Sequence, residues 1–358
     1  MRFAVEQLKD YCQRTMLARG VDEDCAATVA DMLVDAELTG VATHGVSRLA
    51  IYMERVDKGL VSKRNNARIV RESPSALVVD AGNSLGAVGA MFAMDACIRK
   101  ARETGCCFAT VKNSNHFGAA AYYTRRAAEA GMIGFCCTNL TAKIAPHGAA
   151  EPFMGTDPIS VAVPSDGVPV VLDMTPSVVA LGKLILAQKL GQDIPLGWAL
   201  DRDGKPTTDP AAGRAGSLIP IGGPKGSGLA LMVELLSGVL SGAGTATHLH
   251  DLYAFDAPQG VGHFLGAIDV SHFLDLDAFR AGVSDMAAEI KALRKAEGVS
   301  EILLPGERAA RSAVEKEKTG IDIPDAVCAE LAALGEPFGI KRKEESSYGK
   351  GADYGNRQ

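Results

Sequence analysis

CCFATVKNSNHFGAAAYYTRRAAEAGMIGFCCTN (residues 106–139) holds two short apolar runs on either side of a longer, partly polar segment. The runs CCFATVK and MIGFCCTN have the length and the residue types of buried strands, and the segment between them has helical spacing. The same alternation starts earlier, with ALVVD (76–80) and GAMFAMDACIRKARETG (89–105). This rhythm of strands and helices predicts a sheet with helices packed against it.

A hairpin signal follows this alternating region. In PISVAVPSDGVPVVLDM (158–174), two apolar or alternating runs flank Ser165, Asp166 and Gly167, which are residue types that favour a tight turn. HFLGAIDV (263–270) has the pattern of one more strand. Because a hairpin pairs its strands antiparallel, the predicted class is α/β with a mixed sheet flanked by helices.

Helical spacing predominates before and after the sheet region. Residues 4–19 and 22–39 are predicted to be amphipathic helices, and a third helix is expected to start near Val46, after the turn GVATHG (40–45). We therefore expect a helical lobe over 1–75, completed by residues 260–358, and a sheet domain over 76–259. Within and after that domain, helices are expected at 177–190, 226–241 and 276–294.

Length and charge argue against several classes of protein. The 358 residues exceed one ordinary hydrophobic core, which predicts two or three lobes. The net charge is −6 and the lysines and arginines form no block, so we expect no nucleic-acid partner.

Apolar runs end before the roughly 18 residues of a membrane span, and the charged start MRFAVEQLKDYCQ resembles no signal peptide, so we expect a cytoplasmic location. The polar end, 341–358, is expected to be mobile unless a neighbouring subunit holds it.

The cysteines and two histidines give only weak signals for a disulfide or a metal site. The eight cysteines show no C-x-x-C spacing, and both CC pairs lie in predicted strands, where neighbouring side chains point to opposite faces. We expect buried free thiols. His248 and His250 would face one side of an extended segment, but no third ligand stands at a recognisable spacing, so no metal is predicted.

The stretch THGVSRLAIY (43–52) is the first candidate site. In a helix that begins near Val46, Arg48 and Tyr52 stand four residues apart on one face, with Thr43 and His44 in the turn before it. A planar guanidinium suits a carboxylate because it offers paired donors in a fixed orientation. A capping turn followed by a surface arginine is the equally weighted alternative.

His116 is the second candidate, because it follows a predicted strand and precedes a predicted helix. Ligand crevices form at strand ends in α/β sheets, and histidine titrates near neutrality, which suits proton transfer. The small residues Gly118, Ala119 and Ala120 leave room for a flat ring. Taken alone, a loop histidine is more often a structural hydrogen-bonding residue.

Two further stretches are typical of anion or cofactor binding. GGPKGSG (222–228) combines glycines, a lysine and a predicted helix start, which attracts phosphate groups. LDMTPSVVALGK (172–183) runs from a strand end into a predicted helix, with Asp173 either as a ligand or as that helix's N-cap. Neither the P-loop pattern nor G-x-G-x-x-G occurs in the chain, which excludes a Rossmann fingerprint.

Taken together, six motifs resemble the type-2 malate/L-lactate dehydrogenase family. They are THGVSRL, NSNHFGAAAYY, GTDPISVAVP, LDMTPSVVALGK, GWALDRDGKPTTDP and GPKGSGLALMVELLSGVLSGA, and they span nearly the whole chain in order. The family includes malate, ureidoglycolate, sulfolactate and diketogulonate dehydrogenases and cyclic-imine reductases. The resemblance implies a homodimer, a non-Rossmann NAD(P)-binding fold in the sheet domain, and substrate and dimer contacts in the helical lobe.

The resemblance also implies roles for individual residues. His116 would be the catalytic acid and base, and Thr43, His44, Arg48 and Tyr52 would line the substrate and nicotinamide site. The residues expected to contact NAD, with NADP not excluded, are His44, Asn139, Leu140, Asp173, Met174, Thr175, Lys225, Pro305, Gly306 and Glu307.

The function implied by the resemblance is hydride transfer between nicotinamide and a small 2-hydroxy or 2-oxo acid. Malate/oxaloacetate or a lactate-like acid is the first expectation. The alternatives are reduction of a cyclic imine such as piperideine-2-carboxylate, and ureidoglycolate or sulfolactate oxidation. An alternative from a different class of protein is a non-catalytic nucleotide-binding sensor, which would bind its ligand through GGPKGSG alone.

The chain departs from the family pattern at several positions. Asp157 stands for an asparagine, Thr175-Pro176 for Ala-Thr, Leu181 for an arginine, and His147 for an aromatic residue. The first three departures weaken the cofactor contacts expected near 175–181. His147 is open to a role in the substrate pocket or a structural role.

Overall fold

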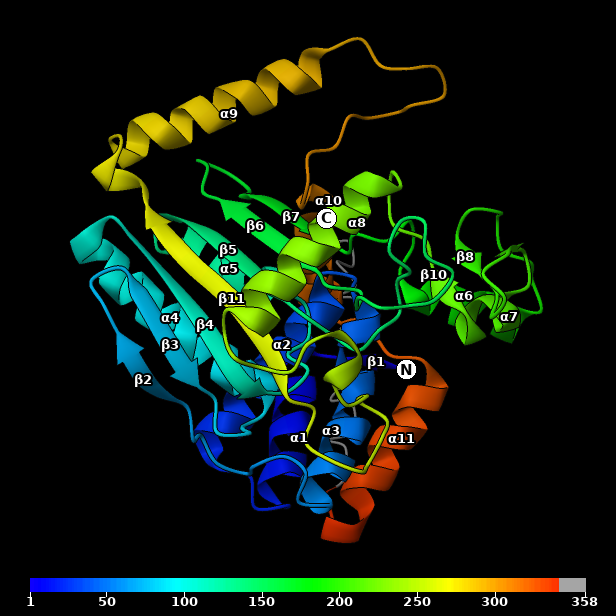
Figure 1. Ribbon diagram of the computed structural model, residues 1–358. Coiled ribbons are helices and arrows are strands. Elements are labelled where there is room, and N and C mark those ends of the chain that lie inside the picture. Colours follow the sequence, from blue (N-terminus) through cyan, green and yellow to red (C-terminus); the bar gives the residue numbers. More distant parts are fainter. Residues whose placement is uncertain (341–358) are drawn as a thin grey trace, which may run out of the picture.

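The computed structural model describes residues 1–340, and its centre is a seven-stranded sheet (Figure 1). The strands lie in the order β2-β3-β4-β11-β5-β6-β7, and only β3 and β4 pair in parallel. Helix α4 (Gly86–Thr104) forms the crossover that this parallel pair requires. The mixed sheet predicted from the sequence is thereby confirmed. The strands are β2 (Arg68–Glu72), β3 (Ala76–Asp80), β4 (Cys106–Ser114), β5 (Met132–Thr138), β6 (Ile159–Val163), β7 (Val170–Met174) and β11 (Val261–Asp269).

Strand β11 lies in the middle of the sheet, although it is the last of the seven strands in the chain. It pairs antiparallel with both β4 and β5. Helix α4 and helix α5 (Ala121–Glu129) cover one face of the sheet, and helix α8 (Pro224–Val233) with its π-helical extension (Glu234–Val239) approaches the other. A side chain at Gly262 would lie 1.9 Å from the Ser237 carbonyl oxygen, so glycine alone permits this contact between backbones.

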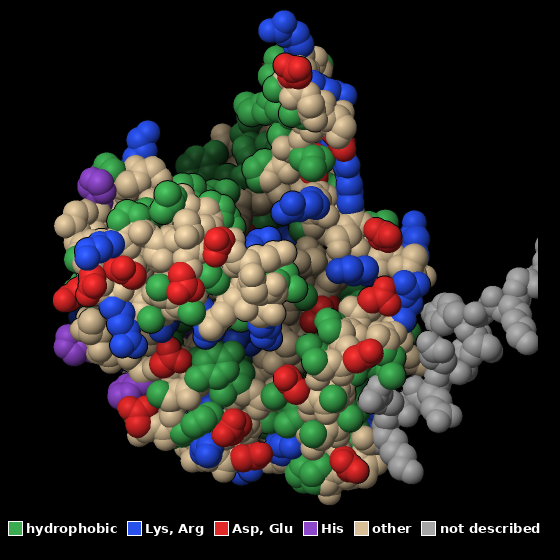
Figure 2. Space-filling view, turned by 90° about the vertical axis from the view of Figure 1, so that its right-hand side faces the viewer, with side chains coloured by type: hydrophobic (Ala, Val, Ile, Leu, Met, Phe, Trp, Pro, Cys, Tyr) green, Lys and Arg blue, Asp and Glu red, His purple; other side chains and the backbone are tan. Residues whose placement is uncertain are grey.

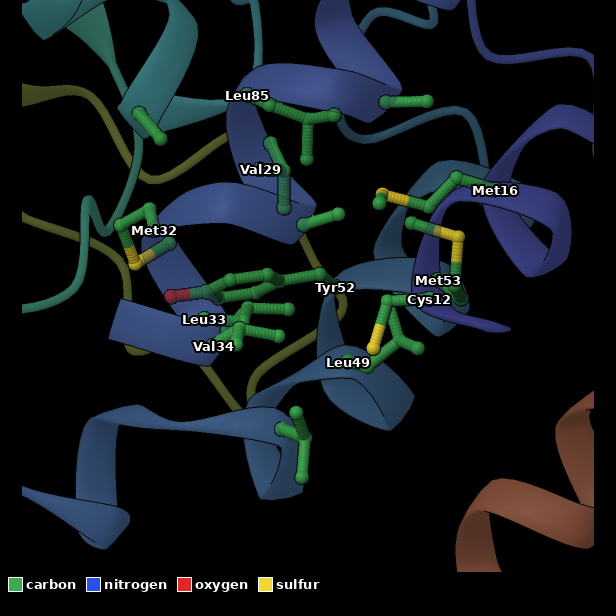
Figure 3. Packing of buried hydrophobic residues seen from close by; sticks show 14 of the residues in the cluster. Cys12, Met16, Val29, Met32, Leu33, Val34, Leu49, Tyr52, Met53 and Leu85 are labelled. Carbon is green, nitrogen blue, oxygen red and sulfur yellow. The ribbon is translucent and has the colours of Figure 1, made fainter. Parts of the chain in front are cut away.

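The helical lobe has its own hydrophobic core. Helices α1 (Val5–Leu17), α2 (Glu23–Leu38) and α3 (Leu49–Asp57) pack together, and Tyr52 lies among their buried side chains (Figure 3). The C-terminal part of the chain contributes to the same core through Ile321, Cys328 and Leu331. These residues belong to β12 (Ile321–Asp322), which pairs with β1 (Arg2–Phe3), and to α11 (Asp325–Gly335).

The predicted domain boundaries fall inside the central sheet. Strand β2 precedes residue 76 and strand β11 follows residue 259, yet both hydrogen-bond within the sheet. A strand as apolar as β11 is most stable when both of its faces are buried. The division into two functional domains stays a prediction, and residues 341–358 lie outside the described residues.

A small unit extends from the sheet and contains α6 (Leu181–Leu190), α7 (Pro210–Ala215) and a three-stranded sheet. Its strands, in the order β10-β8-β9, are Ser217–Leu218, Ala199–Leu200 and Pro206–Thr207. The helix expected at 177–190 begins only at Leu181, because Ser177 bridges to Pro220 and the Val178 N–H donates to the Ile219 carbonyl.

Helix α9 (Leu276–Ala292) projects from the body as an arm, and none of its residues is buried (Figure 1). The following segment returns to the body at α10 (Glu307–Thr319). All eight cysteines are free, and only Cys106 is not fully buried. Within residues 1–340, no helix has the length and apolar character needed to cross a membrane.

Candidate active site

The ends of several strands meet at one edge of the central sheet. Ser114, the last residue of β4, pairs with Val261, the first residue of β11, and Thr138 at the end of β5 pairs with His263. The segments that follow β4 and β5 therefore leave the sheet side by side. His116 stands on the first of these segments, and Asn139 and Leu140 stand on the second.

Five of the predicted site residues meet at this edge. The Tyr52 hydroxyl lies 2.6 Å from Nδ1 of His116, and the rings of His44 and His116 stack at 5.6 Å between centroids. Arg48 donates from Nε to the Thr43 carbonyl at 2.6 Å, and Thr43 Oγ1 lies 3.0 Å from Nδ1 of His44. Residues 64 positions apart in the chain are thus brought into contact.

A tight turn positions His44 and Arg48. Ala42–His44 and Val46–Arg48 are two short 3₁₀ turns, so helix α3 begins at Leu49, later than the expected start near Val46. The buried Glu37 carboxylate accepts from the Val46 N–H at 2.9 Å. A side chain at Gly45 would displace that carboxylate, so glycine there preserves its bond to Val46.

The ring hydrogen bonds of His116 are made at Nδ1. Burial raises the pKa of Tyr52, so the phenol keeps its proton and can donate to Nδ1 of His116 or accept from it. The Gly118 N–H points at the same nitrogen from 3.4 Å. When Nδ1 of the neutral ring accepts, Nε2 carries the proton, and when Nδ1 donates, Nε2 is the acceptor. Within residues 1–340 no partner binds Nε2, so this nitrogen is free to exchange a proton with a ligand.

Both stacked imidazoles are neutral in the free protein. Burial, followed by His44, Arg48 and His263, lowers the pKa of His116 well below its usual value. Burial and Arg48 lower the pKa of His44 to about 4. A bound anion beside Arg48 would offset its positive charge and thereby favour protonation of His116.

A third histidine connects the two strand ends from inside the sheet. His263 is fully buried, and its two ring nitrogens lie 2.7 Å from the hydroxyls of Ser114 and Thr138. Its ring also stacks on Phe117 at 4.5 Å, next to His116 in the chain. His263 therefore holds together the segments that carry His116 and Asn139. The sequence analysis missed this role, because an isolated histidine in a strand gives no spacing signal.

The segment 250–259, which we call the strap, adds residues that the sequence analysis also missed. Gln259 accepts from the His116 N–H at 2.9 Å, and Tyr253 hydrogen-bonds through its hydroxyl to Arg48. The buried Arg55 side chain donates to three carbonyl groups of the strap. These contacts join residues 143 to 205 positions apart, and no local pattern in the sequence indicates them.

Three segments predicted to bind the cofactor also lie next to one another. The Ile221 N–H donates to the Pro176 carbonyl at 2.8 Å, and the His147 N–H donates to the Ser227 hydroxyl at 3.1 Å. The GGPKGSG loop thus packs against the segments that follow β7 and β5. Lys225 is exposed at the start of α8. The N–H groups of Lys225, Gly226 and Ser227 donate to carbonyls of the preceding loop, so the charge of Lys225 is what would attract an anion here.

His147 lies against the GGPKGSG loop. Its ring nitrogen Nδ1 is 3.3 Å from the point that a side chain at Gly223 would occupy. His248 and His250 form no metal centre, since within residues 1–340 no cluster of three histidine, cysteine or acidic side chains could hold a metal ion.

Several predicted cofactor residues use their side chains within the protein. Asn139 is fully buried and its amide binds Glu234, the Gly244 carbonyl and the Gly262 N–H. The Thr175 hydroxyl donates to the Thr156 carbonyl at 2.5 Å. At these positions a cofactor contact would depend on the main chain.

Asp173 and the turn 305–307 flank strand β7. Asp173 accepts from the Ala121 N–H at 2.9 Å, so it caps α5 and not the helix that follows it in the sequence. Pro305 accepts from the Val171 N–H at 3.0 Å. The Glu307 carboxylate accepts from the Leu304 N–H at 3.1 Å and pairs with Lys291. Met174 ends β7, Gly306 lies against Val171 in the same strand, and Leu140 follows β5; their roles stay predictions.

The departure at Asp157 places a carboxyl group in an unfavourable position. Its Oδ1 accepts from the Leu140 N–H at 3.1 Å, but its buried Oδ2 has no partner within the described residues. The backbone is left-handed, with φ of 38°, which asparagine tolerates well. Burial, and then Glu234, raise the pKa of Asp157 well above its usual value.

We therefore expect Asp157→Asn to stabilise the protein, increasingly so at high pH. The raised pKa means that the wild type loses stability as pH rises and the buried acid ionises, whereas asparagine keeps the bond to Leu140 without a charge. Urea denaturation should show a gain of about 1–3 kcal/mol at pH 9 and a smaller gain at pH 5. Asp322→Asn, at an exposed ion pair with Arg2, should show no such gain. Equal effects of Asp157→Asn at both pH values would contradict this account.

A half-buried histidine held by a phenol, with an arginine nearby, is an arrangement suited to proton transfer next to a bound anion. The sheet that carries it lacks the Rossmann fingerprint. The chain belongs to the malate/L-lactate dehydrogenase family, whose profile matches residues 3–332.

Relatives over the full length of the chain act on several substrates. Malate dehydrogenase from Pyrococcus horikoshii is 38% identical over 349 residues, which cover 95% of this chain and 96% of the relative. (2R)-3-sulfolactate dehydrogenase (NADP(+)) from Chromohalobacter salexigens is 38% identical and covers 88% and 92%. Ureidoglycolate dehydrogenase (NAD(+)) from Escherichia coli K12 is 32% identical and covers 91% and 94%.

Two solved structures show the same fold. Malate dehydrogenase from Entamoeba histolytica superposes with a TM-score of 0.91 at 30% identity, over 95% of this chain and 99% of that one. Δ1-piperideine-2-carboxylate reductase from Pseudomonas syringae superposes with a TM-score of 0.83 at 29% identity, over 93% and 99%.

Proposed function

We propose that the protein transfers a hydride between NAD(H) and a small 2-hydroxy or 2-oxo acid, with malate/oxaloacetate as the first expectation. The contact of Tyr52 with His116, beside His44 and Arg48, carries this proposal. It combines a proton donor and acceptor with a guanidinium that can bind a carboxylate.

The residues at the sheet edge fit a dinucleotide. Lys225, exposed at the start of α8, would attract its phosphates, and the segments 139–140 and 173–175 would contact it along the strand ends. When bound, nicotinamide supplies or accepts the hydride. NAD is expected first, and NADP fits the same donors.

The chain's own residues supply orientation and proton transfer. Arg48 binds the substrate carboxylate and turns the carbonyl toward His116. In reduction, doubly protonated His116 gives its Nε2 proton to the oxygen that becomes the hydroxyl and keeps the proton on Nδ1, which then donates to the Tyr52 oxygen. In oxidation, Nε2 of this neutral tautomer takes the proton back. Tyr52 holds Nδ1 in place throughout.

Substrate assays test the proposal. NADH and NADPH oxidation would be followed with oxaloacetate, pyruvate, 3-sulfopyruvate and piperideine-2-carboxylate. Turnover of a 2-oxo acid at least tenfold above the imine supports the proposal. The opposite order supports imine reduction, which the structural likeness to the Pseudomonas syringae reductase favours as second candidate. Tight NADH binding without turnover of any of these compounds would support a sensor.

We further propose a homodimer formed through α9 and α8. Helix α9 exposes Met286 at 64%, α8 exposes Met232 at 49%, and the π-helical extension of α8 exposes Val239 at 62%. Figure 2 shows hydrophobic side chains in the hollow beneath the projecting arm. Exposed apolar surface of this kind marks interfaces between subunits. Sedimentation at micromolar concentration should give twice the mass of one chain, and a monomer would contradict the proposal.

A further inference from the structure

Tyr253 lies beside Arg48. It stands on the strap, its side chain is 61% exposed, and its hydroxyl is hydrogen-bonded to Nη1 of Arg48. The other described partner of Arg48 is the Thr43 carbonyl, which accepts from Nε. The remaining N–H groups of the guanidinium have no acceptor within residues 1–340.

The direction of this hydrogen bond leaves one hydrogen free. A guanidinium has only donors, so the Tyr253 oxygen must accept from Arg48. The phenol hydrogen must then point elsewhere, and no acceptor for it is present among the described residues. Accepting a bond from a cation also polarises the phenol and makes it a stronger donor.

The strap is held firmly enough to fix Tyr253. Arg55, which is 1% exposed, donates to the carbonyls of Leu252, Ala254 and Ala257. Arg55 stands on α3, the helix that also carries Tyr52. The position of Tyr253 is therefore set by the same helix that positions His116.

Asp251 forms a second anchor. Its carboxylate accepts from the Tyr253 N–H at 2.9 Å and lies 3.4 Å from the Lys143 ammonium. The strap is thereby joined to the segment that follows β5. Its last residues also contact the site, where Gln259 accepts from the His116 N–H.

We propose that Tyr253 is a second substrate-binding residue, which donates its hydroxyl hydrogen to the carboxylate that Arg48 holds. The clamp offers guanidinium N–H donors and one O–H donor to the two oxygens of a carboxylate next to the reacting carbonyl. It therefore selects 2-oxo acids over 2-oxo amides and esters. This inference rests on the proposed function and deepens it.

Tyr253→Phe tests the clamp because it removes only the hydroxyl. The KM for the best 2-oxo acid should rise about 10- to 100-fold, which is the effect of one hydrogen bond to a charged group. The kcat and the Kd for NADH, measured by fluorescence titration, should change less than about threefold. Tyr122→Phe is the matched control, since that hydroxyl binds Asp31 in the helical lobe, and it should leave the KM unchanged.

The corresponding 2-oxo amide separates binding from a structural effect. If Tyr253 binds the carboxylate, the KM for the amide should be nearly the same in the wild type and in Tyr253→Phe. Three results would overturn the proposal. The KM could rise equally for the acid and the amide, or the KM for the acid could stay unchanged. The KM for the acid could also fall, which would mean that Tyr253 only obstructs Arg48. A wild type that turns over no 2-oxo acid would instead refute the proposed function, and the clamp with it.

Discussion

Replacing His116 with alanine is expected to lower kcat by about 10²- to 10⁴-fold, which is the usual contribution of a positioned acid or base. The Kd for NADH should change little, because the segments expected to bind the phosphates lie beyond β5, β7 and the start of α8. Stopped-flow measurement of a single turnover at saturating NADH checks the chemical step directly. Near-normal turnover in this variant would remove His116 from the mechanism.

The pH dependence separates loss of an acid or base from loss of structure. The lowered pKa of His116 means that its imidazole is neutral at pH 7 in the free protein. The ring stays neutral at pH values well below about 6.5, which is the usual pKa of histidine. In the oxidation direction, where the neutral ring is the base, wild-type kcat/KM should stay constant above that lowered pKa. It should fall only as pH falls through it.

Reduction has the opposite sign, because it needs the proton. Its kcat/KM should fall as pH rises above the lowered pKa of His116, tenfold for each pH unit, which is the slope for loss of one proton. His116→Ala should lose both of these pH dependences. Tyr123→Phe is a suitable control, because Tyr123 is buried nearby but its hydroxyl binds the Phe117 carbonyl and leaves the His116 ring untouched.

The sequence predicted the parts of the site that local patterns encode. His116 at a strand end, the turn before Arg48, and the spacing of Arg48 and Tyr52 all follow from a few neighbouring residues. The order of the strands does not, because it places β11 between β4 and β5 across more than 120 residues. Contacts of that range depend on packing of the whole core, which periodicity does not reveal.

The same limit explains the wrong or incomplete assignments within the site. Asp173 precedes a predicted helix, so its capping role was expected there, yet it caps α5, which lies 52 residues earlier in the chain. Asn139 has the residue type of a ligand, but its amide is saturated by partners more than 90 residues away. Tyr253 and Gln259 stand in a loop without any regular spacing. In each case the partner lies far along the chain.

Replacing Arg48 with alanine is expected to raise the KM for 2-oxo acids by about 10²- to 10³-fold, since a paired guanidinium and carboxylate typically contribute several kcal/mol. Arg48→Lys should recover only part of this loss, because an ammonium lacks the planar pair of donors. Arg126→Ala is the control, as Arg126 forms an exposed ion pair with Asp95, and it should leave the KM unchanged.

Arg48→Ala should also change the titration of His116, which gives a test independent of substrate binding. Because the positive charge of Arg48 is one cause of the lowered pKa of His116, its removal should raise that pKa toward the usual value. The acid limb of the oxidation profile should then move to higher pH in Arg48→Ala and stay in place in Arg48→Lys, which keeps the charge. A KM increase without this shift would mean that Arg48 binds the carboxylate too far from His116 to influence its proton, and the proposed geometry of proton transfer would be wrong.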